Sequence, residues 1–370
     1  MLVAFASCGG GGTARGEAEG EGTRVEMRHA SYLDITRCDG FTKVEIQNPW
    51  DTTRLLHTYI LVPRDAEVPA QLPEGTLVRT PLTDALVFSA VHVGLLKSLG
   101  AFDAVGGVCD AQYMHDPQIQ ERIRSGRIID CGNGMTPDIE RIMQERPQAI
   151  LLSPFQNSNN NYGKVSQLGI PIIECADYME SSPLGRAEWM RLYGLLFGKG
   201  DEADSLFDAT ESRYMALKAL TDTVARRPKV IIDQRYGQVW NVPAANSTMG
   251  IFIADAGGSN PFSALGNGGS VPLAPEKVLA DAHDADIWFV RYNQKGEKSL
   301  KELAADAPVN SRFKAFKEGN VYGCNTAEVD FYGEVPFHPE RLLADLITRI
   351  HPDLDTIISP QFRYFKKMPR

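Results

Sequence analysis

The sequence has few of the residue patterns on which enzyme chemistry or metal binding depends. Its six cysteines form no C-x-x-C pair, and its seven histidines are scattered without a local pair. It contains no G-x-S-x-G or H-E-x-x-H motif, which would carry a hydrolase nucleophile or a catalytic zinc. Gly106 and Gly107 lack the spacing of a dinucleotide-binding loop. The sequence therefore predicts neither catalytic residues nor a resident metal or cofactor.

The chain also lacks an excess of basic residues. It has 38 Lys and Arg against 47 Asp and Glu, a formal net charge of −9, which argues against a nucleic-acid-binding protein. Hydrophobic residues make up 43% of the chain and charged residues 23%, as in an ordinary soluble globular protein. Because 370 residues exceed the usual size of one domain, we expect two domains, each with its own core.

What the sequence does contain is a repeated stretch. Residues 134–153 combine a helix start, with Thr136 as N-cap followed by proline, apolar residues at helical spacing, a turn and a continuous apolar strand. Residues 270–290 repeat this order less regularly. Glu140 and Glu276 take the same place near the two helix starts. The repeat is compatible with two ordinary units of one α/β protein or with two similar lobes that each present one carboxylate.

The repeat resembles the two lobes of the periplasmic substrate-binding proteins that serve ABC importers of iron–siderophore complexes, haem and cobalamin. Residues 180–199 add the sequence Pro-Leu-Gly-Arg-Ala-Glu-Trp, which is similar to a segment common in the Bacteroidetes branch of these proteins. The resemblance covers nearly the whole chain after about Arg24. It implies an α/β fold of two similar lobes, with mainly parallel sheets, joined by one long rigid helix. It also implies that Glu140 and Glu276 dock onto arginines of the permease dimer.

The first residues predict a membrane anchor. The apolar start ends in small residues before Cys8, as at the end of a lipoprotein signal, and a Gly- and Glu-rich stretch follows. Cys8 is therefore the predicted lipidation site. We expect a monomeric protein of the periplasm, attached to a membrane by this lipid alone.

The patterning also predicts where the parts of the chain begin and end. An antiparallel lead-in sheet over residues 25–62, with an Asp-Gly hairpin turn, precedes a helix over residues 83–100. Residues 201–226 keep helical periodicity without Gly or Pro. The predicted parts are a signal remnant and tether (1–23), an N-terminal lobe (24–199), an interlobe helix (200–226) and a C-terminal lobe (227–370).

Aromatic and polar side chains follow several predicted strands. In open α/β sheets, ligands bind beyond the carboxyl ends of the strands, and a large flat chelate buries its apolar area against aromatic rings. Arg235 and Arg291 could pair with an anionic chelate or a haem propionate. The candidate ligand-binding residues are Tyr113, Phe155, Gln156, Arg235, Tyr236, Trp240, Trp288 and Tyr292.

These observations and the resemblance together predict the substrate-binding component of an ABC importer. It would capture an iron complex, either a siderophore or haem, in an interlobe cleft and deliver it to the membrane permease. Cobalamin remains the alternative ligand. A free zinc or manganese ion is a further alternative, which would need several cleft ligands; only His92 and His115 are placed to contribute.

Overall fold

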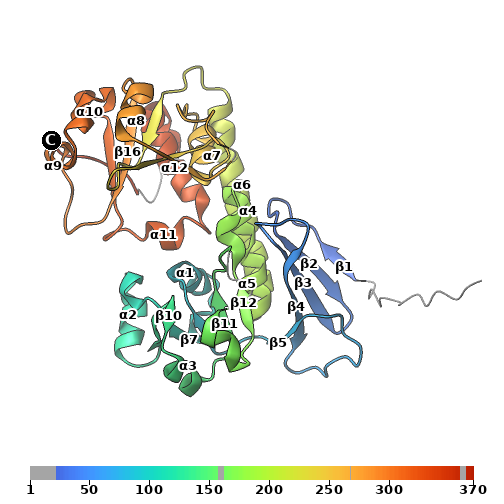
Figure 1. Cartoon of the computed structure of the whole chain (residues 1–370). Coiled ribbons are helices and arrows are strands. Elements are labelled where there is room, and N and C mark those ends of the chain that lie inside the picture. Colours follow the sequence, from blue (N-terminus) through green and yellow to red (C-terminus); the bar gives the residue numbers. More distant parts are fainter. Residues whose placement is uncertain (1–21, 157–161, 267, 359–363) are drawn as a thin grey trace, which may run out of the picture.

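Two α/β lobes joined by one long helix make up most of the molecule (Figure 1). The computed structural model describes residues 22–156, 162–266, 268–358 and 364–370. The long helix α6 (Gly200–Asp222) runs from one lobe to the other, and a separate sheet lies beside its lower half in this view. The predicted fold class is confirmed. The predicted lipidation site, Cys8, lies outside the described residues, as does most of the predicted tether.

The separate sheet is formed by the first part of the chain. Four strands pair antiparallel, and Gly40, with φ 77°, supplies the left-handed conformation of the predicted hairpin turn. A fifth strand, outside the predicted lead-in sheet, pairs parallel with the fourth. In spatial order the strands are β1 (Thr23–Val25), β2 (Leu33–Cys38), β3 (Phe41–Gln47), β4 (Leu55–Pro63) and β5 (Thr76–Thr80).

The first lobe has a parallel five-stranded sheet. Its strands, in spatial order, are β12 (Ile172–Glu174), β11 (Ala149–Leu152), β6 (Ala85–Val87), β7 (Val105–Val108) and β8 (Ile129–Asp130). Its helices include α1 (Ala90–Ser98), α2 (Pro117–Arg124) and α3 (Ile139–Glu145). The helix predicted over residues 83–100 is wrong in its first part, because the buried run at residues 85–87 pairs with β11 and β7 and the helix begins only at Ala90.

The second lobe repeats this arrangement. Strands β13 (Val230–Ile232), β16 (Ile287–Tyr292) and β17 (Val321–Asn325) are parallel, and β18 (Lys366–Lys367) is antiparallel. A parallel bridge from Lys229 to Ser259 lies beside β13, where β7 lies beside β6 in the first lobe. Its helices include α7 (Thr248–Asp255), α8 (Pro275–Ala282), α9 (Leu300–Asp306), α10 (Lys314–Glu318), α11 (Phe331–Glu334) and α12 (Pro339–Ile350).

The repeated stretch of the sequence forms equivalent units in the two lobes. In each, a short antiparallel pair leads into a helix and then into a central strand: β9 (Gly132–Asn133) and β10 (Thr136–Pro137) precede α3 and β11, and β14 (Trp240–Pro243) and β15 (Ser270–Leu273) precede α8 and β16. The N-cap of α3 is Asp138, whose side chain accepts from Arg141 N, and not Thr136, which is held in β10. Glu140 and Glu276 lie exposed in the first turns of α3 and α8.

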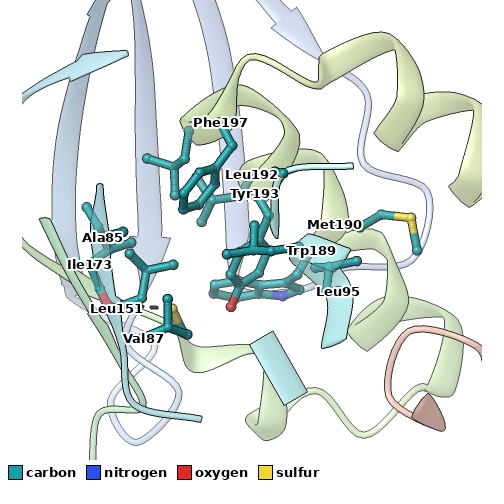
Figure 2. Packing of buried hydrophobic residues seen from close by; sticks show 14 of the residues in the cluster. Ala85, Val87, Leu95, Leu151, Ile173, Trp189, Met190, Leu192, Tyr193 and Phe197 are labelled. Atoms are coloured by element: carbon teal, nitrogen blue, oxygen red, sulfur yellow. Dashed lines mark hydrogen bonds between the residues drawn. The ribbon is translucent and has the colours of Figure 1, made fainter. Parts of the chain in front are cut away.

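The N-terminal sheet and the first lobe share one hydrophobic core. Trp189, between helices α4 (Pro183–Glu188) and α5 (Met190–Phe197), contributes to it together with Tyr193 and neighbouring apolar side chains of α5 (Figure 2). Trp189 is fully buried, as its helical register predicts, and donates a hydrogen bond to Glu180. The hydroxyl of Tyr59, from β4, donates to Ile172 O and accepts from Glu174 N. This sheet is therefore packed onto the lobe rather than tethered to it.

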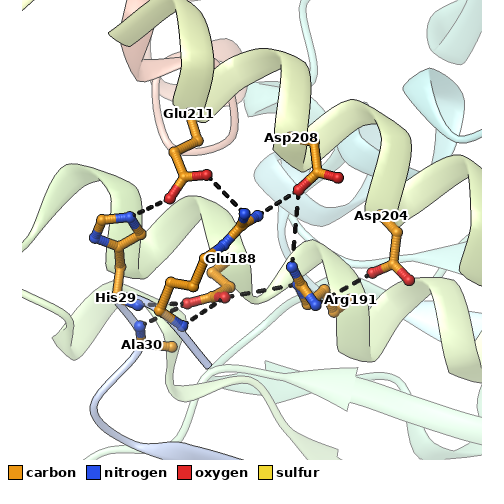
Figure 3. Close-up of polar contacts among 8 residues, drawn as sticks. His29, Ala30, Glu188, Arg191, Asp204, Asp208 and Glu211 are labelled. Carbon is orange, nitrogen blue, oxygen red and sulfur yellow. Dashed lines mark hydrogen bonds and ion pairs between the residues drawn. The ribbon is translucent and has the colours of Figure 1, made fainter. Parts of the chain in front are cut away.

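A second set of contacts ties the N-terminal sheet to the interlobe helix (Figure 3). The buried carboxylate of Glu188 accepts hydrogen bonds from the backbone N–H groups of Arg28, His29 and Ala30 at 2.9, 2.7 and 2.9 Å. The side chains of Arg28 and His29 reach Glu211 of α6, at 2.9 and 2.6 Å. One carboxylate thus satisfies three successive backbone donors where the chain enters β2.

Candidate functional site

A cavity of about 690 Å³ lies between the two lobes, a volume typical of small-molecule sites. Its walls are built by the segments that follow β6, β7, β11, β16 and β17, together with the turn between β9 and β10 and helix α11. This is the carboxyl edge of both sheets, where the α/β rule expects a ligand. The first lobe contributes Phe88, Ser89, Ala90, Val91, Asp110, Tyr113, His115, Gly134, Met135, Pro137, Leu152, Ser153, Phe155, Tyr162, Gly163 and Val165, and the second Asn293, Thr326, Val329, Asp330, Phe331, Tyr332 and Gly333.

Aromatic rings reach the cavity from both lobes. Tyr113 is 67% exposed, Phe155 43% and Tyr332 57%, so each ring offers apolar surface that the protein itself does not cover. Phe155 meets Tyr162 edge-on at 6.1 Å between ring centroids, and Tyr332 meets Phe331 in the same way at 5.4 Å. Rings on opposite lobes could enclose a large ligand, and burial of their exposed faces would stabilise the complex.

Of the candidate ligand-binding residues, two line the cavity and four others lie elsewhere. Tyr113 and Phe155 line it, whereas the exposed Gln156, next in the chain, is not among its lining residues. Arg235 donates to the backbone carbonyls of Gly237 and Asp306. Tyr236 is 89% exposed outside the cavity, and the Tyr292 hydroxyl accepts from Lys298 N on the second lobe. The sequence patterns identified the strand ends correctly, but they did not predict whether each side chain points into the cavity.

The two remaining candidates, Trp240 and Trp288, are core residues. Their exposed fractions are 1% and 0%, and their rings stack at 5.5 Å between centroids. Both indole N–H groups donate to backbone carbonyls, Trp240 to Ile232 and Trp288 to Asp233. Trp288 lies in the central strand β16, which is covered on both faces, and Trp240 packs on it. Their prediction as ligand contacts is therefore wrong.

Arg291 and His92 also have internal partners. Arg291 donates two hydrogen bonds to Asp233, at 2.7 and 2.6 Å. Burial acts to lower the pKa of Arg291, but the bonds to Asp233 outweigh it and raise the pKa, so the guanidinium stays charged and paired. It lies 5.3 and 5.8 Å from the ring centroids of Phe331 and Tyr332 and supports them from outside the cavity. His92 is buried against Asp177 at 2.9 Å and does not line the cavity.

Three lining residues carry acidic or basic side chains. Asp110, at φ 53°, accepts from Gly134 N and from the Asn133 amide, both at 3.1 Å. Asp330 caps α11 by accepting from Gly333 N at 3.0 Å. Partial shielding from solvent raises the pKa of the Asp330 carboxyl, while the backbone bond from Gly333 and the nearby His115 oppose the rise. Across the described ranges, no group of three or more His, Cys, Asp or Glu could hold a metal ion.

The sequence interpretation did not select several residues that line the cavity. Phe88 was assigned to a helix, although it follows a buried strand, and recognition of that strand at residues 85–87 would have placed it at a strand end. Met135 is 78% exposed on the turn between β9 and β10. This hairpin was not predicted, because Thr136 was interpreted as the N-cap of a helix. Asp110 and Asp330 are short polar residues in loops, which the pattern alone does not distinguish from ordinary turn residues.

Comparison with known proteins places this architecture in a family. The sequence pattern described as "Periplasmic binding protein" matches residues 87–327. Two uncharacterized lipoproteins of Methanocaldococcus jannaschii are 28% and 23% identical over 312 and 305 residues; each alignment covers 80% of this chain, and 72% and 76% of the respective relative.

Solved structures share the fold. A possible iron-binding periplasmic solute-binding protein of Staphylococcus epidermidis is 15% identical with a TM-score of 0.57, and the match covers 74% of this chain and 100% of that one. A periplasmic haem-binding protein of Pseudomonas aeruginosa is also 15% identical, with a TM-score of 0.55, and the match covers 73% and 93% of the two chains.

No helix in the described part of the chain combines the length and apolarity needed to cross a membrane. The prediction of a binding protein rather than an enzyme is confirmed, because both the family and the structures of the same fold are solute-binding proteins. With the family pattern matched over residues 87–327 and an interlobe cavity at the strand ends, the chain belongs to the periplasmic binding protein family.

Proposed function

We propose that this protein is the substrate-binding component of an ABC importer that captures a metal chelate, such as an iron–siderophore complex, between its lobes and delivers it to a permease. The observation that carries the proposal is the cavity of about 690 Å³, with aromatic rings from both lobes at the strand ends. Haem and cobalamin are alternative chelates for the same cavity. Structures of the same fold include a periplasmic haem-binding protein and an ABC-type Fe3+-hydroxamate transport system, which supports this ligand class.

The proposal includes attachment to the periplasmic face of a membrane through a lipid on Cys8. Two relatives of this chain bear the name lipoprotein, and the sequence around Cys8 agrees with lipidation. A Gly- and Glu-rich stretch separates Cys8 from β1 in the sequence.

Ligand binding is tested by calorimetric titration with a panel of ferric siderophores, haemin and cyanocobalamin. Tyr113→Ala together with Tyr332→Ala should weaken binding of the true ligand at least about tenfold, because the stacking surface of both lobes is removed. Tyr236→Ala is the matched control, since that tyrosine is exposed outside the cavity. The proposal fails if no chelate binds saturably, or if the control weakens binding as much as the cavity variant.

Docking to the permease is assigned to Glu140 and Glu276. Both are exposed in the first turn of equivalent helices, α3 and α8, so each lobe presents one carboxylate at corresponding positions. Glu140→Ala with Glu276→Ala should abolish uptake in cells that contain the cognate permease and leave chelate affinity unchanged. Glu121→Ala with Glu318→Ala removes two other exposed carboxylates and should leave uptake intact. Loss of chelate affinity in the first variant would contradict the docking role.

The free-ion alternative finds less support. It relied on His92 and His115, and His92 is buried on Asp177 away from the cavity. Titration with zinc and manganese in the same assay tests it directly, because saturable binding of either ion alone would favour a free-ion receptor.

A further inference from the structure

The charged side chains that line the interlobe cavity are mainly acidic. Among its described lining residues none is Lys or Arg, whereas two are aspartates, Asp110 and Asp330. Of the lining residues that the structure describes, His115 alone can become cationic. The two aspartates come from different lobes, so a ligand between the lobes would have a carboxylate on each side.

Cations that lie beside the lining are paired or point elsewhere. Arg291, behind the rings of Phe331 and Tyr332, is held by two hydrogen bonds to Asp233. Lys97 borders a smaller cavity shared with Asp330 and pairs with Asp116 at 2.5 Å. Lys164 is flanked by two lining residues but is exposed and is not itself part of the lining. None of these cations supplies a free positive charge inside the cavity.

The two carboxylates are held in place by the backbone. Asp110 accepts from Gly134 N and Asp330 from Gly333 N. Asp110 also accepts from the side-chain amide of Asn133. Because these bonds fix the carboxylates, neither can swing away from an approaching anion without leaving backbone donors unpaired.

We propose that this cavity selects chelates of zero or positive net charge and rejects anionic ones, and that Asp110 and Asp330 determine this specificity. The inference deepens the proposed function and rests on it. An anionic chelate would lose hydration in an apolar cavity, meet no Lys or Arg among the described lining residues and face two fixed carboxylates. A neutral chelate avoids this cost, and a cationic one also gains from the carboxylates and from the exposed faces of Tyr113 and Tyr332.

The class of ligand follows from this charge pattern. The cavity should accept neutral and cationic ferric tris-hydroxamates and neutral corrinoids. It should reject ferric tris-catecholates and haem, whose propionates are anionic. The net charge of −9 over the whole chain acts in the same direction during encounter. This reverses the expectation drawn from Arg235 and Arg291 that the cleft pairs with an anionic group.

The test uses one ferric chelate in three charge states: ferrioxamine B, which carries one positive charge, its neutral N-acetyl derivative and its anionic N-succinyl derivative. Calorimetric titration at pH 7.5 and low salt should rank the affinities cationic, neutral, anionic, with at least about tenfold between the ends of the series. Added salt should narrow the difference. Equal or tighter binding of the anionic member overturns the proposal.

Two variants assign the effect to the carboxylates. Asp110→Asn and Asp330→Asn keep a side-chain oxygen that can accept the backbone hydrogen bonds. Together they should reduce the ratio of affinities between the cationic and the anionic chelate, the spread of the series, at least about threefold. Asp65→Asn, at an exposed position outside the cavity, changes the net charge equally and should leave the spread unchanged. If the double variant loses affinity equally for all three members, the aspartates are structural and the proposal is overturned.

The wider panel separates this inference from the proposed function. Binding of ferric tris-catecholates or haemin in preference to every neutral or cationic chelate would support a chelate receptor and overturn the charge selection. Absence of binding by every chelate, of any charge, would overturn both. Binding confined to neutral and cationic members supports both, even if the ferrioxamine core itself is a poor fit.

Discussion

The buried carboxylate of Asp177 pairs with side chains from two helices of the first lobe. It pairs with His92 of α1 at 2.9 Å and with Arg186 of α4 at 3.0 Å, and it is fully buried. Burial acts to raise the pKa of this carboxyl, but His92 and Arg186 outweigh burial, so the net pKa is lower than the ordinary value. Asp177 therefore links the helix at the edge of the ligand cavity to the core beneath it.

Asp177→Asn should lower the free energy of unfolding by about 3 kcal/mol, because His92 and Arg186 would lose the buried charge that pairs with them. The measurement is urea unfolding, combined with amide hydrogen exchange in α1 and α4 to locate the loss. Asp65→Asn is the exposed control and should change the free energy by no more than about 0.5 kcal/mol. A similar small change for Asp177→Asn would show that the pairing does not stabilise the lobe.

The same carboxylate gives a pH dependence with a defined sign. Because its pKa is lower in the folded protein than in the unfolded chain, its contribution is fully present above the unfolded value of about 4 and is lost as pH falls through the folded value. The urea concentration at which half of the wild-type protein is unfolded should therefore decrease as the pH is lowered below about 4. The midpoint of Asp177→Asn should fall less over the same range, and equal slopes would contradict this account.

At the residue scale, the sequence predicted the cavity only in part. Tyr113 and Phe155 were identified because they follow strands, and both line the cavity. Trp240 and Trp288 met the same criterion, yet their rings are buried in the core. Distance from a strand end does not reveal which face of the sheet a side chain occupies, since that depends on what packs above it. Arg291 was mistaken for a ligand partner because Asp233, which neutralises it, is 58 residues away in sequence.

Among the elements, the N-terminal sheet precedes the matched family pattern, which begins at residue 87. It is joined to the rest by its shared core and by Glu188, whose carboxylate accepts three backbone N–H groups from residues 28–30. We expect this carboxylate to order the entry into β2. Without it, three backbone donors would be left in a partly buried site without their acceptor.

Glu188→Gln should loosen the attachment of this sheet by about 2 kcal/mol, because the amide replaces one accepting oxygen with a donor facing backbone donors. Hydrogen exchange should become faster at residues 28–30 and in β2, with the second lobe unaffected. Glu202→Gln, on an exposed side chain of α6 that pairs with Lys199 at 2.9 Å, is the control. Unchanged exchange at residues 28–30 in Glu188→Gln would show that packing alone holds the sheet.

The elements themselves were predicted well where one pattern was strong. Both copies of the repeat, the Asp-Gly hairpin and the interlobe helix are present in the structure. The error at residues 83–100 has a local cause: the buried strand at residues 85–87 is apolar on both faces, and such a short run fits a helix as well as a strand. Its pairing with β11, more than sixty residues later, decides the outcome, and no local pattern contains that information.

For the whole molecule, the decisive feature is how α6 joins the lobes. Its first half, with Ala203 and Phe207, is part of the core of the first lobe, and its second half, with Tyr214 and Leu217, is part of the core of the second. Asp255 of α7 accepts from Tyr214 at 2.7 Å, which fixes the second half further. At about 1.5 Å per residue the helix is roughly 35 Å long, and no stretch of it is left unpacked to act as a hinge.

A second contact between the lobes lies at the cavity. Helix α1 packs against α11, and a Cβ added at Gly94 would lie 3.4 Å from the backbone oxygen of Gly333. This close approach sets the separation of the lobes beside the lining residues of α11. Closure around a ligand would have to bend α6 and displace this contact together, whereas rotation of side chains such as Tyr113 and Tyr332 needs neither.

We therefore expect the lobes to keep their separation when a chelate binds. Small-angle X-ray scattering of the full chain should give a radius of gyration, about 21 Å for a compact chain of this length, that differs by less than about 0.5 Å between the free and the saturated protein. Amide exchange along α6 should be equally slow in both. A contraction of more than about 1 Å would contradict a rigid connection, and faster exchange at one end of α6 would then locate the hinge. Because ligand entry in a rigid receptor does not require lobe closure, chelate binding should also be fast, with affinity set by dissociation.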